Sequence, residues 1–149
     1  MSGNGRTPAT WAYAVEGKPS TMLEIALRSV SQQPRRLPEC NGDTGAWVRD
    51  LAVCLADGNC RAAVLFCKDA GLACCVANKV PGVRAVAVAG VGQAVRALRN
   101  LGANLLVVET AGRTYYECRE LLRLCREHPS SCPPGLACVL QELDGHAHR

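Results

Sequence analysis

Short apolar runs alternate along the chain with longer stretches in which apolar residues recur every three or four positions. The runs have the length and composition of buried strands, and they occupy residues 11–16, 62–66, 83–88 and 105–108. The periodic stretches predict helices, which begin after residue 20 and cover 47–55, 70–78, 91–98 and 118–125. The pattern therefore predicts strands and helices in alternation.

Two of the predicted helices carry a start signal in their first turn. Thr21 with Glu24, and again Thr114 with Glu117, have the spacing of a capping box. In that arrangement each of the two side chains accepts a hydrogen bond from the other residue's backbone N–H. We therefore expect Thr21 and Thr114 to cap the helices that follow them.

The segments outside this alternation have turn-forming or polar residues. Segment 34–45 contains two prolines, two glycines and an arginine pair, which predicts a loop with at most a poor strand. Residues 1–9 are polar and predict a flexible N-terminus, and adjacent prolines within 129–149 predict a loop-like C-terminal tail that contains cysteine and histidine. A single α/β domain is expected between them, over residues 10–128.

Strands that alternate with helices at this spacing predict a parallel sheet covered by helices on both faces. With right-handed crossovers, the fold class is a Rossmann-like three-layer α/β/α sandwich with a four- to five-stranded sheet. Ligands of such sheets bind beyond the carboxyl ends of the strands. Segments 16–20, 67–71 and 109–113 follow predicted strands, so we expect the functional site there.

Composition narrows the class of protein. Hydrophobic residues make up 48% of the chain and aromatic residues 4%, so the core must consist mainly of Ala, Val and Leu. The net charge of +4 is spread without a long block of one sign, which argues against a nucleic-acid partner. No stretch approaches the roughly 20 apolar residues that span a membrane, and the N-terminus lacks a secretory signal. We expect a cytoplasmic protein.

Ten cysteines are many for 149 residues. Because they lie inside apolar periodic segments, and because no secretory signal precedes them, reduced thiols that act as small hydrophobic residues are expected. The spacing of Cys125, His128 and Cys132 invites a zinc site, but no second Cys-x2-Cys pair accompanies it. Burial on the core side of the last helix explains Cys118 and Cys125, so we expect no metal.

The most specific string in the chain lies between residues 67 and 85. Cys67 ends a predicted strand, and the helix after it closes with Ala-Asn-Lys at 77–79, a short apolar-Pro-Gly turn and Arg84-Ala85. Ala-Asn at 103–104 precedes the next strand. This pattern resembles the central motif of the type B ribose-5-phosphate isomerases, the family that also contains the galactose-6-phosphate isomerase subunits. The resemblance covers about residues 10–125.

The resemblance implies aldose–ketose isomerisation of a phosphorylated pentose or hexose in carbohydrate metabolism, with no metal or other cofactor. In the family a base removes the proton next to the carbonyl, and in many members that base is the cysteine at the strand end. N–H groups of a glycine-rich loop stabilise the resulting oxyanion, and arginines hold the phosphate. A homodimer with the site at the subunit interface is also implied, with no membrane partner.

Carried over residue by residue, the resemblance makes Cys67 the catalytic residue. The substrate-binding candidates are Asp43, Lys68, Asp69, Gly71, Arg84, Asn100 and Arg113.

The chain departs from the family at the positions of the family's catalytic and binding residues. The loop after Cys67 reads Lys-Asp-Ala-Gly-Leu, whereas the family reads Gly-Thr-Gly-x-Gly, so side chains replace the glycines that let backbone approach an anion. Asn100 stands where the family has a histidine that assists ring opening, and an amide does not titrate near neutral pH. The family's early Asp-His pair is absent, and its Tyr is replaced by Thr44. Glu16 and Glu109, at predicted strand ends, are the carboxylates that remain as substitutes.

The local sequence leaves alternatives open for the key residues. A strand end, a following helix N-terminus and Lys68 would each favour the thiolate of Cys67, but the thiol also suits a small buried side chain. Asp69 either contacts the ligand or caps the next helix. Arg84 and Arg113 suit bidentate phosphate binding or a salt bridge.

Three hypotheses of function follow. The chain is a divergent sugar-phosphate isomerase, or a catalytically impaired relative that binds a phosphorylated metabolite in a regulatory or scaffold role. The third hypothesis is an enzyme of changed, thiol-based reaction that uses Cys67 with Lys68.

Overall fold

The computed structural model describes residues 10–30, 34–38 and 42–146. The elements are β1 (Trp11–Val15), α1 (Thr21–Ser29), β2 (Arg35–Arg36), α2 (Thr44–Ala56), β3 (Ala62–Cys67), α3 (Ala70–Ala77), β4 (Ala85–Ala87), α4 (Val91–Asn100), β5 (Leu105–Glu109), α5 (Tyr115–Glu127) and α6 (Pro134–His146). The five strands form one parallel sheet in the order β2-β1-β3-β5-β4. The predicted fold class and the alternation of strands and helices are confirmed.

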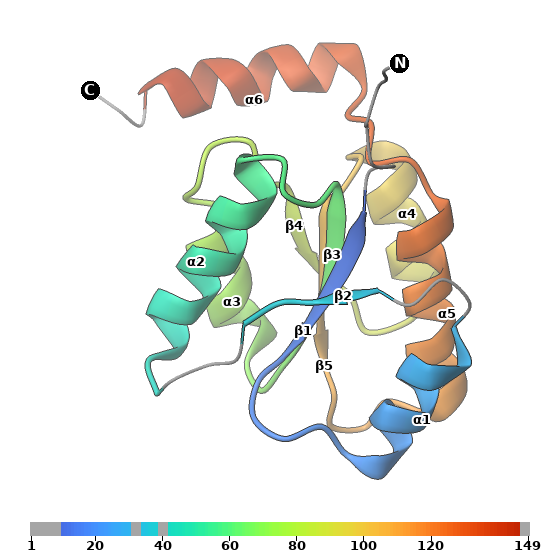
Figure 1. Ribbon diagram of the computed structural model, residues 1–149. Coiled ribbons are helices and arrows are strands. Elements are labelled where there is room, and N and C mark those ends of the chain that lie inside the picture. The colour runs from blue at the N-terminus through green and yellow to red at the C-terminus, as the bar shows by residue number, and fades with distance from the viewer. Residues whose placement is uncertain (1–9, 31–33, 39–41, 147–149) are drawn as a thin grey trace, which may run out of the picture.

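Helices cover both faces of the sheet, so the molecule has three layers (Figure 1). α2 and α3 pack on one face, and α1, α4 and α5 pack on the other. The central strand β3 is buried along its whole length because both of its faces are covered. Its side chains alternate, with Val64 and Phe66 in the core under α1, α4 and α5, and Leu65 and Cys67 in the core under α2 and α3.

One predicted helix start is confirmed and the other is wrong. Thr114 and Glu117 form the expected capping box at the start of α5. Thr21 does not cap α1, because Ser20 takes that position and its Oγ accepts the N–H of Leu23 at 3.2 Å. Serine is an equally good cap, and the residue before the helix has the extended backbone that a cap requires.

The C-terminal segment forms a helix, so the prediction of a loop-like tail is wrong. α6 begins at Pro134 and runs along the amino-terminal ends of the strands (Figure 1). Proline is well suited to the first turn of a helix, where its missing N–H would have no partner. None of the α6 residues whose burial is described is fully buried. A helix without a buried face needs no strong apolar stripe, and for this reason the sequence pattern did not predict it.

Residues 1–9, for which a flexible N-terminus is predicted, lie outside the described residues. In the part of the chain that the structure describes, no helix is long and apolar enough to cross a membrane. The nine cysteines described there are free thiols, and Cys118 and Cys125 are buried in the core as expected.

Candidate functional site at the carboxyl edge of the sheet

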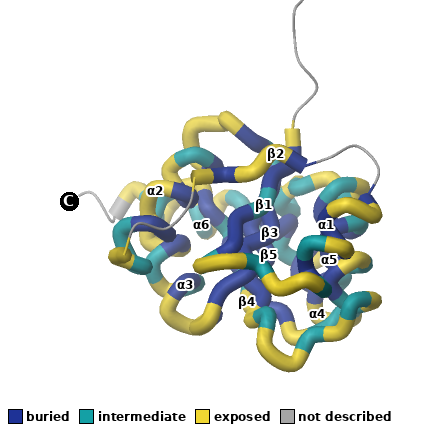
Figure 2. The backbone as a smooth tube through the Cα atoms, turned by 60° about the horizontal axis from the view of Figure 1, so that its bottom comes forward, coloured by how far each residue is buried: buried dark blue, intermediate teal, exposed yellow. Residues whose placement is uncertain are grey.

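The three segments expected to form the site lie together at the carboxyl ends of β1, β3 and β5. Val15 is in register with Phe66, and Cys67 is in register with Glu109, so Glu16, Cys67 and Glu109 end adjacent strands. The helices after β1 and β5 lie on one face of the sheet and the helix after β3 lies on the other. The chain therefore leaves β3 in the opposite direction from its two neighbours, the arrangement that opens a ligand crevice in such sheets (Figure 2).

Cys67 lies at the centre of this edge, and its surroundings oppose ionisation. The side chain is buried, with 4% of the residue exposed. The pKa of Cys67 is raised to about 12, and burial is the largest cause. The negative charges of Glu16 and Glu109 also raise the pKa, and together they outweigh the hydrogen bond from the backbone N–H of Asp69, which lowers it. The thiolate expected from Lys68 and the helix N-terminus is therefore not favoured, and the thiol stays protonated at neutral pH.

Three of the backbone N–H groups that follow Cys67 are bonded to carboxylates. Glu16 Oε1 accepts the N–H of Lys68 at 2.9 Å, and Glu109 Oε2 accepts the N–H of Ala70 at 2.8 Å. Asp69 caps α3, because its Oδ1 accepts the N–H of Leu72 at 3.1 Å. Three negative groups thus satisfy the donors at a helix N-terminus that would otherwise attract an anion.

The start of α2 reaches the same edge. The side chain of Asp43 accepts the N–H of Ala46 at 3.2 Å and caps the helix. The hydroxyl of Thr44 donates to Glu16 Oε2 at 3.0 Å, so Glu16 is held from two sides. From the sequence, Thr44 has no role beyond replacing the family's Tyr, because no local signal pairs it with a residue 28 positions earlier.

A cavity of about 300 Å³ lies on the β4 side of this edge. Its lining comprises Ala70, Ala87, Val88, Ala89, Gln93, Glu109, Ala111 and Arg113. Arg113 is half-buried and lies 3.7 Å from Glu117. The N–H of Thr114 lowers the pKa of Glu117, so that carboxylate stays ionised beside the arginine.

Lys68 and Gly71 lie in the same loop but contribute differently. The backbone of Lys68 is engaged with Glu16, and its side chain is exposed. A Cβ on Gly71 would lie 3.5 Å from Asp69 Oδ1, which is an ordinary contact. Nothing in the described structure requires glycine at position 71.

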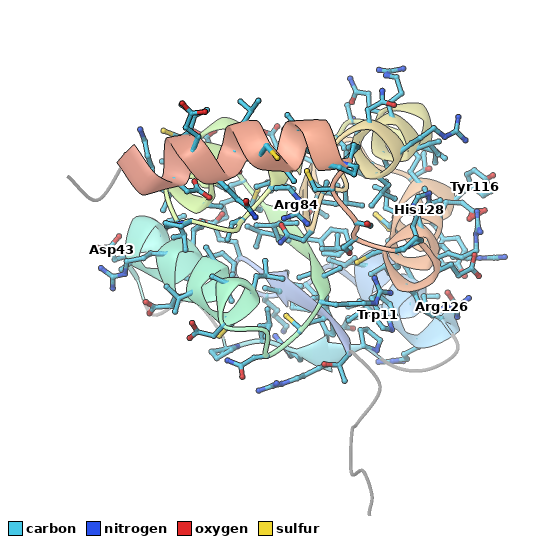
Figure 3. All side chains as sticks on the ribbon, turned by 90° about the horizontal axis from the view of Figure 1, so that it is seen from above. Trp11, Asp43, Arg84, Tyr116, Arg126 and His128 are labelled. Carbon is cyan, nitrogen blue, oxygen red and sulfur yellow. The ribbon has the colours of Figure 1, made fainter. Side chains whose placement is uncertain are left out.

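Two predicted site residues lie at the opposite edge within this chain. Arg84 precedes β4, and its guanidinium donates to the carbonyl oxygens of Gly102 at 2.9 Å, Gly82 at 3.3 Å and Ser130 at 3.1 Å. Figure 3, seen from above that edge, places Arg84 beside α6. Asn100 ends α4 and is exposed. The chain brings neither side chain to Cys67.

Comparison with solved structures assigns the fold. Trypanosoma brucei type B ribose-5-phosphate isomerase superposes with a TM-score of 0.74 at 19% identity, covering 94% of this chain and 99% of that one. The chain has the fold of the type B ribose-5-phosphate isomerases. The enzyme from Mycoplasma genitalium, solved with bound ribulose-5-phosphate, gives 0.75 at 16% identity over 97% and 99% of the two chains. That from Thermotoga maritima gives 0.72 at 13% identity over 90% and 98%.

These likenesses are structural. No protein-family model matches the sequence, and no curated protein matches it significantly. The similarity to the type B isomerases predicted from the 67–85 string is thus confirmed for the fold.

The residues that carry the resemblance build the amino edge of this isomerase fold. The side chain of Asn78 bonds both the N–H and the carbonyl oxygen of Ala85, at 2.8 and 2.9 Å. Asn104 accepts the N–H of Arg84 at 2.7 Å and donates to the carbonyl oxygen of Gly82 at 3.0 Å. Both amides position the short strand β4, so the string reports on how the sheet is built.

Proposed function

We propose that this chain binds a phosphorylated sugar at the carboxyl edge of the sheet and does not isomerise it through Cys67. The proposal that Cys67 does not catalyse isomerisation rests on two features found together. The buried thiol is protonated, and nearby loop N–H groups are already bonded to carboxylates. This corresponds to the second hypothesis, a catalytically impaired relative of the isomerases with a binding role.

Isomerisation needs a base and a stabilised oxyanion. The base must be unprotonated near neutral pH, and the thiol of Cys67, with a pKa raised to about 12, is not. The enediolate oxygen needs preorganised donors, and the N–H groups of Lys68 and Ala70 are bonded to Glu16 and Glu109. A developing negative charge would also meet these carboxylates in a partly dry site, where repulsion is strong.

The same edge retains groups suited to binding. The cavity of about 300 Å³ lies at the lower end of the range for small-molecule sites. Arg113 has the planar fork that suits a phosphate, and Lys68 adds an exposed positive charge. Glu109 lines the cavity and offers a carboxylate oxygen to sugar hydroxyls, and Gln93, whose Oε1 accepts the N–H of Ala89 at 2.6 Å, offers its amide N–H groups. The phosphate would lie by Arg113 in the cavity that Glu109 also lines, whereas Glu16 and Asp69 are not part of its lining.

The test combines ligand-induced thermal stabilisation with a turnover assay. Ribose 5-phosphate, ribulose 5-phosphate and hexose 6-phosphates are compared with the same sugars lacking phosphate. Arg113→Ala should abolish stabilisation by the phosphorylated sugars. Arg119→Ala, which removes an exposed arginine of the helix α5 that follows Arg113, should leave it unchanged and serves as the matched control.

The outcomes separate the hypotheses. Stabilisation without turnover, lost in Arg113→Ala, supports the binder. Turnover that disappears in Cys67→Ala would contradict the proposal and restore the cysteine-based isomerase. An absence of stabilisation by every sugar phosphate would refute the phosphate site.

A second candidate is an isomerase in which Glu109 replaces the thiol as base. Glu109 is exposed and lines the same cavity as Arg113, and glutamate is among the side chains that serve as general bases. This candidate predicts turnover that survives Cys67→Ala and is lost in Glu109→Gln. The homodimer that the resemblance implies is tested by light scattering on the same samples.

A further inference from the structure

Helix α6 is attached to the body of the molecule near both of its ends. At its start, Arg84 Nη2 donates to the carbonyl oxygen of Ser130 at 3.1 Å. Gly102 approaches the Ser131 backbone so closely that a Cβ at position 102 would overlap the carbonyl oxygen of Ser131. Near the other end, Asp144 Oδ2 accepts the N–H of Gly82 at 3.0 Å.

A cavity of about 330 Å³ lies under the middle of the helix, between these attachments. Its walls come from α6, from the turn before β4 and from the residues around the end of α4. They comprise Asn78, Gly82, Val83, Arg84, Ala85, Leu101, Cys132, Ala137, Leu140, Gln141 and Asp144. The inward residues Ala137 and Leu140 are only partly buried, because empty space takes the place of a packed neighbour.

The chemistry of the lining favours an uncharged occupant. The Asn78 amide is fully committed to Ala85, and the Arg84 guanidinium is committed to three carbonyl oxygens. Arg84 and Asp144 carry opposite charges and are each already hydrogen-bonded to backbone groups, so the lining has no net charge that would offset the lost hydration of a charged ligand. The Gln141 side chain makes no hydrogen bond within the described residues, and the remaining wall is largely aliphatic.

We propose that the cavity under α6 binds a small, uncharged, mainly apolar molecule that carries one hydrogen-bond donor for the Gln141 carboxamide. The site lies at the amino edge of the sheet, opposite the cavity that contains Arg113. Within one chain it shares no lining residue with the proposed sugar-phosphate site. A bound molecule would supply the contacts that Ala137 and Leu140 lack and so hold α6 more firmly on the body.

Indole is a suitable probe, since it is uncharged and planar and has one N–H donor. The measurement is titration of the full chain by two-dimensional NMR, with the amides of Val83, Leu101 and Leu140 as reporters. Saturable shifts are expected with indole, and none with indole-3-carboxylate, which has the same ring and a negative charge.

Variants locate the binding. Ala137→Phe fills the cavity and should weaken binding at least about tenfold, whereas Cys138→Phe places the same ring on the exposed side of α6 and should not. Gln141→Leu removes the acceptor without opening space and should weaken binding about fivefold, the effect of one neutral hydrogen bond. Gln141 is exposed, so this variant does not depend on the core. Absence of saturation with indole, or equal binding by Ala137→Phe and Cys138→Phe, would overturn the proposal.

Discussion

The ionisation of Cys67 gives the most direct test of the proposed loss of catalysis. Its pKa of about 12, against an ordinary 9.0, is a difference of about three units. At pH 8 the thiolate is therefore about a thousandfold rarer than in an unperturbed cysteine. Alkylation proceeds through the thiolate, so iodoacetamide should modify Cys67 at least that much more slowly than an exposed cysteine.

The assay follows alkylation of individual cysteines by peptide mass spectrometry, with exposed Cys75 as the standard within the same molecule. Glu16→Gln and Glu109→Gln each remove a charge that raises the pKa of Cys67, and Glu16 has the larger effect. Both variants should accelerate alkylation of Cys67, Glu16→Gln more. Neither should reach the rate of Cys75, because burial is the first cause of the shift. Glu142→Gln, an exposed and remote carboxylate, is the control.

The contribution of Cys67 to stability changes with pH in a definite direction. The folded chain holds the Cys67 proton to a higher pH than the unfolded chain, so stability from this group is complete below pH 9.0 and decreases as the pH rises toward about 12. Labelling should therefore rise continuously across that range. A rate for Cys67 equal to that of Cys75 at pH 8, or a plateau below pH 9, would show that the thiol is activated and that the reasoning is wrong.

Three further predictions concern stability. Asn104→Ala should lower the free energy of unfolding by about 1–3 kcal/mol in urea titrations, because it leaves the Arg84 backbone N–H without its partner and the Gly82 carbonyl with only the 3.3 Å bond from Arg84 Nη1. Gly102→Ala should cost about 1–3 kcal/mol, because φ is +66° and a Cβ would overlap Ser131; hydrogen exchange should show α6 losing protection first. Thr114→Ala should cost about 1 kcal/mol by removing the α5 cap, and Thr114→Ser should restore it.

The elements that cover or form the core were predictable from the sequence. β3 is a run of buried residues, and α5 has both a cap and an apolar stripe. The two-residue strand β2 had only a weak signal, because Arg35 and Arg36 are exposed and join the sheet through their backbone. α6 was missed for a similar reason: it lies over a cavity, so its residues show no buried stripe.

The location of the candidate site was predictable from the sequence, but the electrostatic surroundings of Cys67 were not. The strand ends predicted that Glu16, Cys67 and Glu109 would meet, and they do. Local features around Cys67 favoured a thiolate because a helix N-terminus and Lys68 are its neighbours in the chain. Burial and two carboxylates from other strands outweigh them. The bonds from Lys68 to Glu16 and from Ala70 to Glu109 span 52 and 39 positions, which no local pattern encodes.

The Ala-Asn-Lys string identified the fold without identifying the activity, and the structure gives the physical reason. The side chains of Asn78 and Asn104 supply hydrogen-bond partners for backbone groups of β4 and of the turn before it. Replacing either one leaves polar backbone without partners, which is costly in a partly buried turn. In this chain the two asparagines therefore serve the construction of β4 and not the binding of a ligand at the carboxyl edge. The groups that decide the chemistry lie at the opposite ends of the strands, where a carboxylate can take the place of a bound anion without disturbing the sheet. A search for activity in this fold should therefore weigh the loop after Cys67 above the string that reveals the fold.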